Sequence, residues 1–215
     1  MMSQRHYSHV DSFLIGLDQA LRTVFGRPAV SQRASPAARF EEVALDESER
    51  RHVARLMRIN HTGEVCAQGL YQGQALTARD AEIRDALERS AEEETDHLAW
   101  CEERLQQLDD RKSLLNPLWY AGSFAMGALA GIAGDRYSLG FVVETERQVE
   151  SHLEGHLKEI PSDDAKTRAI IRQMKADEIH HAQTARDAGG ADLPAPIRWA
   201  MKGAAKVMTR TVYWV

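Results

Sequence analysis

The sequence predicts an all-α protein: a four-helix bundle built around a di-metal centre, with amphipathic and apolar accessory helices. Three observations predict this fold class. The composition favours residues that form helices well, and it contains few prolines and few runs of β-branched residues. Apolar residues recur at helical spacing over most of the chain. Glutamates and histidines interrupt these apolar faces at four places that lie at matching heights along the expected helices.

The composition limits the classes of function. A chain of 215 residues with 43% hydrophobic residues can bury a substantial core. Its formal net charge of −5 argues against a general affinity for nucleic acid. The two cysteines, Cys66 and Cys101, have no CxxC spacing, which argues against a thiolate metal site and a disulfide framework. A reduced, cytosol-facing location is therefore expected.

Residues 1–45 are predicted to form an N-terminal amphipathic helix followed by a linker. The helix is expected over residues 10–25, starting after Asp11, and docking on the domain is favoured over contact with a membrane or a partner. Residues 26–40 contain two prolines and are expected to be the linker. No secretory signal peptide is apparent, but the first forty residues are poor in acids, so a transit peptide is the alternative. The apolar positions of the helix are Phe13, Leu14, Leu17, Leu21 and Val24.

Residues 46–190 are predicted to form the bundle. The first helix begins with a capping acid at Asp46 and runs to about Thr77, and the second begins near Asp80. The third is expected over residues 138–160, and the fourth follows and stops at Gly189.

The segment 113–137 connects the two helix pairs, and its first 22 residues carry no charge. A transmembrane span needs about 20 apolar residues, so this segment is a candidate for one. Its many glycines and alanines make it only weakly hydrophobic, and Asn116 and Pro117 interrupt its start. We therefore predict a close-packed crossover helix, with Leu118, Trp119, Phe124 and Met126 as candidates for contact with a membrane.

Residues 191–215 are predicted to form a basic amphipathic helix. Lys and Arg recur every four residues on one face, and aromatic residues lie near both ends. This pattern is typical of helices on a membrane surface, and a fifth helix docked on the core is the alternative. The basic residues are Arg198, Lys202, Lys206 and Arg210. The apolar residues are Ile197, Met201, Ala204, Ala205, Met208 and Val212, with Trp199, Tyr213 and Trp214 as the aromatic residues.

Two Glu-x-x-His motifs, Glu94 with His97 and Glu178 with His181, suggest metal binding. Residues three apart share one face of a helix, so each carboxylate and imidazole can reach the same ion. The spacing alone has little specificity, because a third copy occurs at Glu49 and His52. Position along the helices must decide which copies matter.

In the first predicted hairpin, Glu64 and Glu94 each lie fifteen residues from the turn near residue 79, or roughly 22 Å along their helices. They are therefore expected to lie side by side. Glu49 and His52 lie at least twelve residues further from the turn than Glu64, so that copy is excluded.

The second hairpin repeats the arrangement. Glu146 and Glu178 each lie sixteen residues from Ser162, at the centre of the turn. Glu144 is an alternative to Glu146, but it lies off the apolar stripe and roughly 3 Å out of level. Glu146 is therefore preferred.

Four carboxylates in a protein interior need compensating cations, because a buried unpaired charge costs several kcal/mol. No Lys or Arg lies on the predicted inward faces, and two divalent ions would supply the missing charge. Oxygen and nitrogen ligands without thiolate suit iron or manganese better than structural zinc. The pattern is the one found in ferritin-like di-iron and di-manganese bundles. The predicted ligands are Glu64, Glu94, His97, Glu146, Glu178 and His181.

With these residues in place, the chain resembles the demethoxyubiquinone hydroxylase family of di-iron carboxylate proteins. The resemblance covers about residues 47–212. It rests on four motifs: His61-Thr-Gly-Glu64, Glu92-Glu-Glu-Thr-Asp-His97, Val143-Glu-Thr-Glu146 with the following His152, and Asp177-Glu-Ile-His-His181.

The resemblance implies an O2-dependent di-iron monooxygenase with two iron ions per chain. Its substrate would be a polyprenylated methoxy-benzoquinol, hydroxylated on the ring in ubiquinone biosynthesis. It implies Glu94 and Glu178 as bridging carboxylates, Glu64 and Glu146 as terminal ones, and His97 and His181 as one nitrogen ligand for each iron. A peripheral location on the cytoplasmic side of the cell membrane is expected, with residues 196–215 and 118–134 forming a hydrophobic face for the isoprenoid tail. Other ubiquinone-synthesis proteins and a homo-oligomer are candidate partners.

Several neighbouring residues are candidates for supporting roles. Metal-bound histidines usually donate their second nitrogen to an acid, so Asp177 and Glu93 are candidates for that contact. Tyr71 is expected to fill the core. His61 is equally compatible with contact to a ligand or with packing, and His152, His156 and His180 are expected to pack or form hydrogen bonds.

Two other classes of function stay open at this point. A ferritin-like iron-storage protein would oxidise iron without an organic substrate, although the apolar amphipathic segments argue against a soluble cage. A non-enzymatic, membrane-associated helical bundle would bind no iron. A rubrerythrin-type peroxidase is disfavoured because the chain has too few cysteines for a four-cysteine module.

Overall fold

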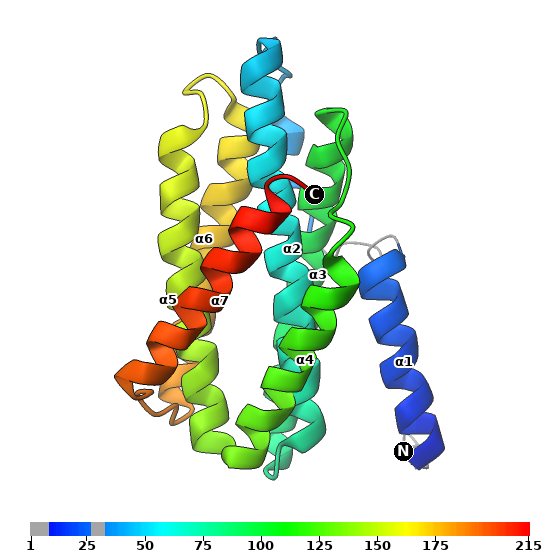
Figure 1. Cartoon of the computed structure of the whole chain (residues 1–215), viewed down its shortest axis with the longest axis vertical. Coiled ribbons are helices and arrows are strands. Elements are labelled where there is room, and N and C mark those ends of the chain that lie inside the picture. Colours follow the sequence, from blue (N-terminus) through cyan, green and yellow to red (C-terminus); the bar gives the residue numbers. More distant parts are fainter. Residues whose placement is uncertain (1–8, 27–32) are drawn as a thin grey trace.

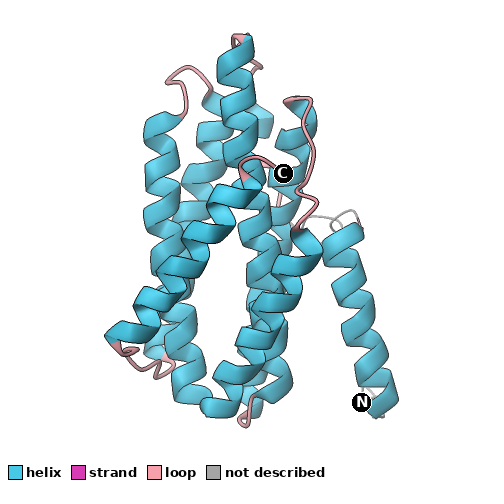
Figure 2. Ribbon diagram, in the orientation of Figure 1, coloured by secondary structure: helices cyan, strands magenta, loops and turns pink. Residues whose placement is uncertain are grey.

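The structure, a computed structural model, describes residues 9–26 and 33–215. In that part of the chain every regular element is helical (Figure 2). The elements are α1 (His9–Phe25), the short 3-10 helix η1 (Pro36–Arg39), α2 (Glu47–Thr77), α3 (Ala81–Gln107), α4 (Asn116–Ala133), α5 (Asp135–Glu159), α6 (Ala165–Asp187) and α7 (Ala195–Val212).

Helices α2, α3, α5 and α6 form the predicted bundle (Figure 1). Helix α2 packs against α3 and α5 packs against α6, and the two hairpins meet where α3 contacts α6 and α2 contacts α5. The fold is therefore a ferritin-like four-helix bundle, as the sequence predicted. The division of the chain into parts at residues 45 and 190 stays a prediction. Ala37 of η1, which precedes the first of these boundaries, is buried in the core of the bundle.

The start signals of the first two bundle helices are confirmed. The Asp46 carboxylate accepts hydrogen bonds from the backbone N–H groups of Ser48 and Glu49, and the Glu49 side chain accepts one from the N–H of Asp46. Asp80 accepts a hydrogen bond from the N–H of Glu82 at the start of α3. These caps set the height of both helices relative to the turn between them.

The third bundle helix begins at Asp135, so the predicted start at residue 138 was three residues late. Gly134, with a φ of 118°, ends α4 and lets the chain turn at once into α5. The Asp135 carboxylate accepts hydrogen bonds of 3.1 and 2.9 Å from the backbone N–H groups of Arg79 and Asp80. These long-range contacts extend the helix, and local sequence does not reveal them.

Helix α4 is the close-packed crossover helix that the sequence predicted. It lies along α2 at backbone contact: a Cβ added at Gly73 would collide with the carbonyl oxygen of Phe124, and one at Gly127 would collide with that of Leu70. Among the described helices, none combines the length and the apolar character that crossing a bilayer would require.

Helix α7 crosses the outside of α2 and α5 (Figure 1). Its end is fixed by the Tyr213 hydroxyl, 2.9 Å from His52 Nδ1, and by the Arg55 guanidinium, 4.5 Å from the ring centroid of Trp214. Helix α1 contacts α2 and α4, and its docking is limited to the last turns, where Val24 is buried. The other described apolar side chains of the predicted stripe, Leu14, Leu17 and Leu21, are exposed, and the Phe13 side chain lies outside the described part.

Candidate metal centre

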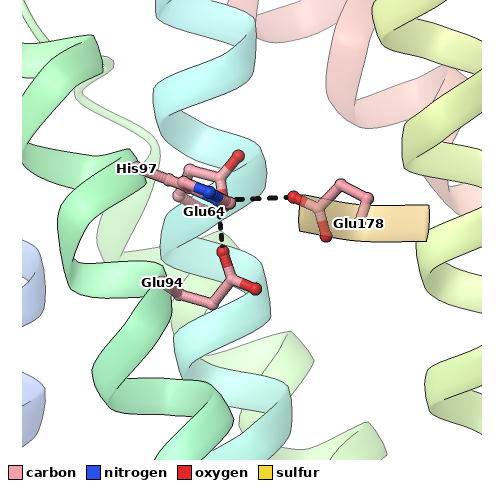
Figure 3. Close-up of side chains that lie close together, drawn as sticks. All are labelled: Glu64, Glu94, His97 and Glu178. Carbon is pink, nitrogen blue, oxygen red and sulfur yellow. Dashed lines mark ion pairs between the residues drawn. The ribbon is translucent and has the colours of Figure 1, made fainter. Parts of the chain in front are cut away.

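Four buried side chains from three helices converge in the middle of the bundle (Figure 3). Glu64 comes from α2, Glu94 and His97 from α3, and Glu178 from α6, and each offers one ligand atom within 4.8 Å of the others. His97 Nδ1 lies 2.7 Å from Glu94 Oε2, 3.4 Å from Glu178 Oε1 and 3.7 Å from Glu64 Oε2. The heights along the helices therefore match, as the sequence predicted.

The other two predicted residues lie next to this group. His181 Nδ1 is 3.0 Å from Glu94 Oε1 and 3.6 Å from Glu178 Oε2. Glu146 lies beside Glu178, whose charge adds to burial in raising the pKa of Glu146. Glu144 instead accepts a hydrogen bond of 2.7 Å from Gln148 Nε2. The geometry thus favours Glu146 over Glu144.

Several buried polar atoms of this cluster make no regular hydrogen bond among the described residues and face other charged atoms of the cluster instead. Such atoms cost about 1–3 kcal/mol each when they lose water without a replacement, and more when charged. Ions of positive charge would satisfy all of them at once, so the donor set fits a site for divalent metals. The atoms are both carboxylate oxygens of Glu94, Oε2 of Glu178 and the Nδ1 atoms of His97 and His181.

The second nitrogen of each histidine is held by an acid from the opposite motif. His97 Nε2 lies 2.9 Å from Asp177 Oδ2, and His181 Nε2 lies 2.8 Å from Glu93 Oε2. When Nε2 carries the proton and donates it to the acid, the lone pair of Nδ1 is left free toward the cluster. Both candidate contacts from the sequence are present, and they point each ring at the centre.

Without metal, the cluster holds protons. Burial raises the pKa of Glu64 well above its usual value. Burial alone would lower the pKa of His181, but Glu178 and Glu94 outweigh it and raise the pKa to about 12. Burial would likewise raise the pKa of Glu94, but His97 and His181 reverse this and lower it. Metal ions would take the place of these protons, so metal binding and proton release are coupled.

The other histidines weighed in the sequence analysis do not belong to the four-residue group at the centre. His152 and His156 pack against each other with ring centroids 4.0 Å apart, and His180 is exposed. The Nδ1 atom of His61 lies within hydrogen-bond distance, 3.4 Å, of the amide nitrogen of Asn116 in α4. The third motif is not part of this group: His52 Nδ1 lies 2.9 Å from the Tyr213 hydroxyl, and its Nε2 lies 3.2 Å from Glu159.

Tyr71 is fully buried in the core, as predicted. Its hydroxyl also donates a hydrogen bond of 2.5 Å to Glu146 Oε1, which sequence reasoning missed. The available signal was its place two turns after Glu64 on the same face of α2.

A cavity of about 800 Å³ lies between α2, α4, α5 and α7. Glu64, Glu146 and Glu178 are among the residues that line it, and the walls are mainly apolar. Its size and lining suit a small organic molecule. The predicted apolar face of α7 contributes Ile197, Met201, Ala204, Ala205 and Met208.

The chain matches known proteins over most or all of its length. The family model described as ubiquinone biosynthesis protein COQ7 matches residues 51–212. The chain is 56% identical to a 3-demethoxyubiquinol 3-hydroxylase of Nitrosococcus oceani, over 100% of both chains. It is 58% identical to one of Xanthomonas oryzae pv. oryzae, over 97% of this chain and 96% of the relative. It is 55% identical to one of Pseudomonas putida, over 99% of both chains. All six cluster residues lie within the part that the family model matches.

Proposed function

Because the chain belongs to the family of the ubiquinone biosynthesis protein COQ7, we propose that it is a 3-demethoxyubiquinol 3-hydroxylase. It is an O2-dependent monooxygenase that adds a hydroxyl group to the ring of a polyprenylated methoxy-benzoquinol. The observation that carries this proposal is the buried carboxylate and histidine cluster, three of whose carboxylates line a mainly apolar cavity.

The proposed metal ligands are the six clustered residues. Glu94 lies close to both histidines, and Glu178 lies close to both as well, which suits bridging roles for these two carboxylates. Glu64 and Glu146 are the terminal carboxylates, and His97 and His181 each bind one ion. Two iron ions bound here would supply the binding and reduction of dioxygen.

The protein's own residues define where the reaction takes place. One oxygen atom enters the ring in place of a hydrogen, and the other leaves as water with two electrons and two protons from a reductant. Asp177 and Glu93 orient the two imidazoles, and the Tyr71 hydroxyl holds one oxygen of Glu146. Tyr71, Glu146 and His97 are themselves buried, so solvent screens the contacts at these residues only weakly.

The cavity is the proposed quinol site. The ring would lie beside Glu64, Glu146 and Glu178, and the isoprenoid tail would run along the apolar face of α7. A second part of the wall comes from α4, with Trp119 and Met126. These two helices are the ones whose outer faces would meet the lipid that holds the substrate.

We propose that the protein binds peripherally to the cytoplasmic side of the cell membrane. Leu118 and Leu129 of α4 and Trp199 of α7 are exposed, and the basic residues of α7 are exposed as well. Attraction to anionic lipid contributes about 1 kcal/mol for each such charge. Sedimentation with anionic vesicles at low salt tests this, with the double variant K202E/K206E expected to bind less than the wild type. A wild type that ignores such vesicles would exclude the membrane proposal.

The activity is tested directly by incubating reduced, iron-loaded protein with dioxygen and a demethoxyubiquinol analogue. Mass analysis should show one added oxygen atom in the product, and heavy oxygen supplied as O2 should appear in it. If iron-loaded protein consumes dioxygen and leaves the quinol unchanged, the hydroxylase proposal is wrong and iron oxidation alone is the better account.

A further inference from the structure

Residues 33–42, which precede α2, pack on α3 and α6, the two helices that carry the Glu-x-x-His motifs. Ala37 of η1 is buried in the core, and η1 contacts α6. Glu42 accepts hydrogen bonds of 2.9 and 2.7 Å from Arg104 Nη1 of α3 and lies 3.1 Å from Lys166 Nζ of α6. The family model matches only from residue 51, so these contacts come from a part of the chain outside it.

Arg33 in this segment reaches the outer edge of the metal cluster. Its Nε donates a hydrogen bond of 2.8 Å to Asp96 of α3, and its Nη1 lies 2.9 Å from Asp177 of α6. Trp100 fixes the residue from a third direction: the guanidinium lies 4.8 Å from the Trp100 ring centroid, and the indole N–H donates to the Arg33 carbonyl at 3.3 Å. One side chain thus braces α3 against α6.

The contact to Asp177 continues to the cluster. Oδ2 of Asp177 faces both Arg33 Nη1 and His97 Nε2, and Oδ1 accepts a hydrogen bond of 2.9 Å from Gln173. Both oxygens are therefore engaged, and the carboxylate cannot rotate without breaking one of these contacts. His97 in turn can point Nδ1 only at the carboxylates of the cluster.

We propose that Arg33 is a positioning residue for the metal ion bound by His97. This inference rests on the proposed metal centre and adds a residue to it from outside the bundle. Arg33 fixes Asp177, Asp177 fixes the ring of His97, and the ring sets the direction of one metal bond. Changes in residues that orient metal-binding histidines typically reduce metal affinity by about 10–100-fold.

The test is a metal titration of Arg33→Ala. Apo-protein is titrated with Co²⁺, whose visible spectrum reports ligand geometry, and with Fe²⁺ under anaerobic conditions. One of the two ions should bind about 10–100-fold more weakly than in the wild type, while the other keeps its affinity. Arg33→Lys, which keeps the charge but reaches only one acid at a time, should lie between the two.

Glu42→Gln is the matched control. It weakens the contacts of the same segment with α3 and α6 but leaves Asp177 untouched. If Glu42→Gln loses the same metal ion as Arg33→Ala, the segment acts only by packing and the proposal is wrong. Equal affinities for both ions in Arg33→Ala and wild type would also overturn it.

Two outcomes of the metal titration distinguish a failure of this inference from a failure of the proposed function. A wild type that binds no metal contradicts the metal centre itself, whereas two normal sites in Arg33→Ala contradict only the role of Arg33. Because the Arg33 side chain is 42% exposed, the variant is expected to fold. The metal-free form of Arg33→Ala could nevertheless melt at a lower temperature than that of Glu42→Gln. In that case Arg33→Lys decides, because the proposal requires Arg33→Lys to recover part of the metal affinity that Arg33→Ala loses.

Discussion

The two halves of the metal centre are built on one pattern but are supported differently. Each half has a Glu on its first helix and Glu-x-x-His on its second. In one half, the outer nitrogen of His97 contacts Asp177, whose side chain is 17% exposed and is held by Arg33 and Gln173. In the other half, the outer nitrogen of His181 contacts Glu93, whose side chain is 59% exposed.

The difference shows which properties a duplicated pattern fixes. The repeat fixes the type and height of each ligand, because both follow from spacing along a helix. The rigidity of each histidine depends on what surrounds its outer nitrogen, and that comes from parts of the chain that are not repeated. We therefore expect one firmly held metal position and one more adjustable position.

The largest effect is expected at Glu94, because this residue contacts the histidines of both halves. Its two oxygens lie 2.7 Å from His97 Nδ1 and 3.0 Å from His181 Nδ1. In Glu94→Gln both sites lose a negative ligand, so iron content should fall from two ions per chain to near zero and hydroxylation should become undetectable. Iron analysis of purified protein checks this, with the exposed Glu92→Gln on the same helix as control. Retention of two ions in Glu94→Gln would contradict the shared role.

The next test compares the two halves by removing the acid that contacts the outer nitrogen of each histidine. Asp177→Ala should weaken binding of one metal ion by about 10–100-fold, since the buried His97 loses its partner. Glu93→Ala should cost less than about 10-fold, because water can replace an exposed carboxylate at His181. Anaerobic Fe²⁺ titration of both variants provides the measurement. Equal losses in the two variants would show that exposure of the outer acid does not matter.

A smaller effect concerns a feature that the halves share, a buried neutral histidine. Burial lowers the pKa of His61 in α2 to about 3 and that of His156 in α5 to about 2. Both values lie below the unfolded value of about 6.5, so the unfolded chain binds the proton first and stability falls as pH drops below that value. Between pH 7 and pH 5 each histidine should cost about 2 kcal/mol of the free energy of unfolding.

Urea unfolding of metal-free protein at several pH values checks this. The slope of the free energy of unfolding against pH gives the number of protons that the chain takes up when it unfolds. In His61→Gln and in His156→Gln this number should be smaller than in wild type by up to about one. The exposed His180→Gln is the matched control for the loss of a histidine. A pH dependence that stays the same in both buried variants would contradict the assignment.

The smallest expected effect concerns the hydrogen bond that joins the halves, from Tyr71 of α2 to Glu146 of α5. Tyr71→Phe removes the donor and should lower the free energy of unfolding of metal-free protein by about 1 kcal/mol. Tyr120→Phe, which removes a partly buried hydrogen bond to Gln72, is the control and should cost less. A Tyr71→Phe variant as stable as wild type would show that this contact is energetically neutral.

Much of this arrangement could be predicted from local signals. Asp46 and Asp80 mark helix starts, and counting from the turns placed Glu64 beside Glu94 and Glu146 beside Glu178. These predictions work because helical rise is uniform, so sequence distance converts directly to height.

The rest depends on contacts between distant parts of the chain. Nothing near Arg33 in sequence indicates that it meets Asp177, 144 positions later. Nor does the sequence around residue 135 show that its carboxylate binds the turn after α2 and so extends α5 by three residues. Such contacts are decided by packing after the helices form, and no periodicity encodes them.

The glycine contacts between α2 and α4 have a consequence for how variants of this protein should be interpreted. An added methyl group at Gly73 or Gly127 would have to push the two backbones apart, and α2 would carry Glu64 with it. A displacement of about 0.5 Å is already enough to spoil a preorganised site. Inactivating substitutions found along this contact, well away from any ligand, should therefore be examined for altered metal geometry before they are classed as folding defects.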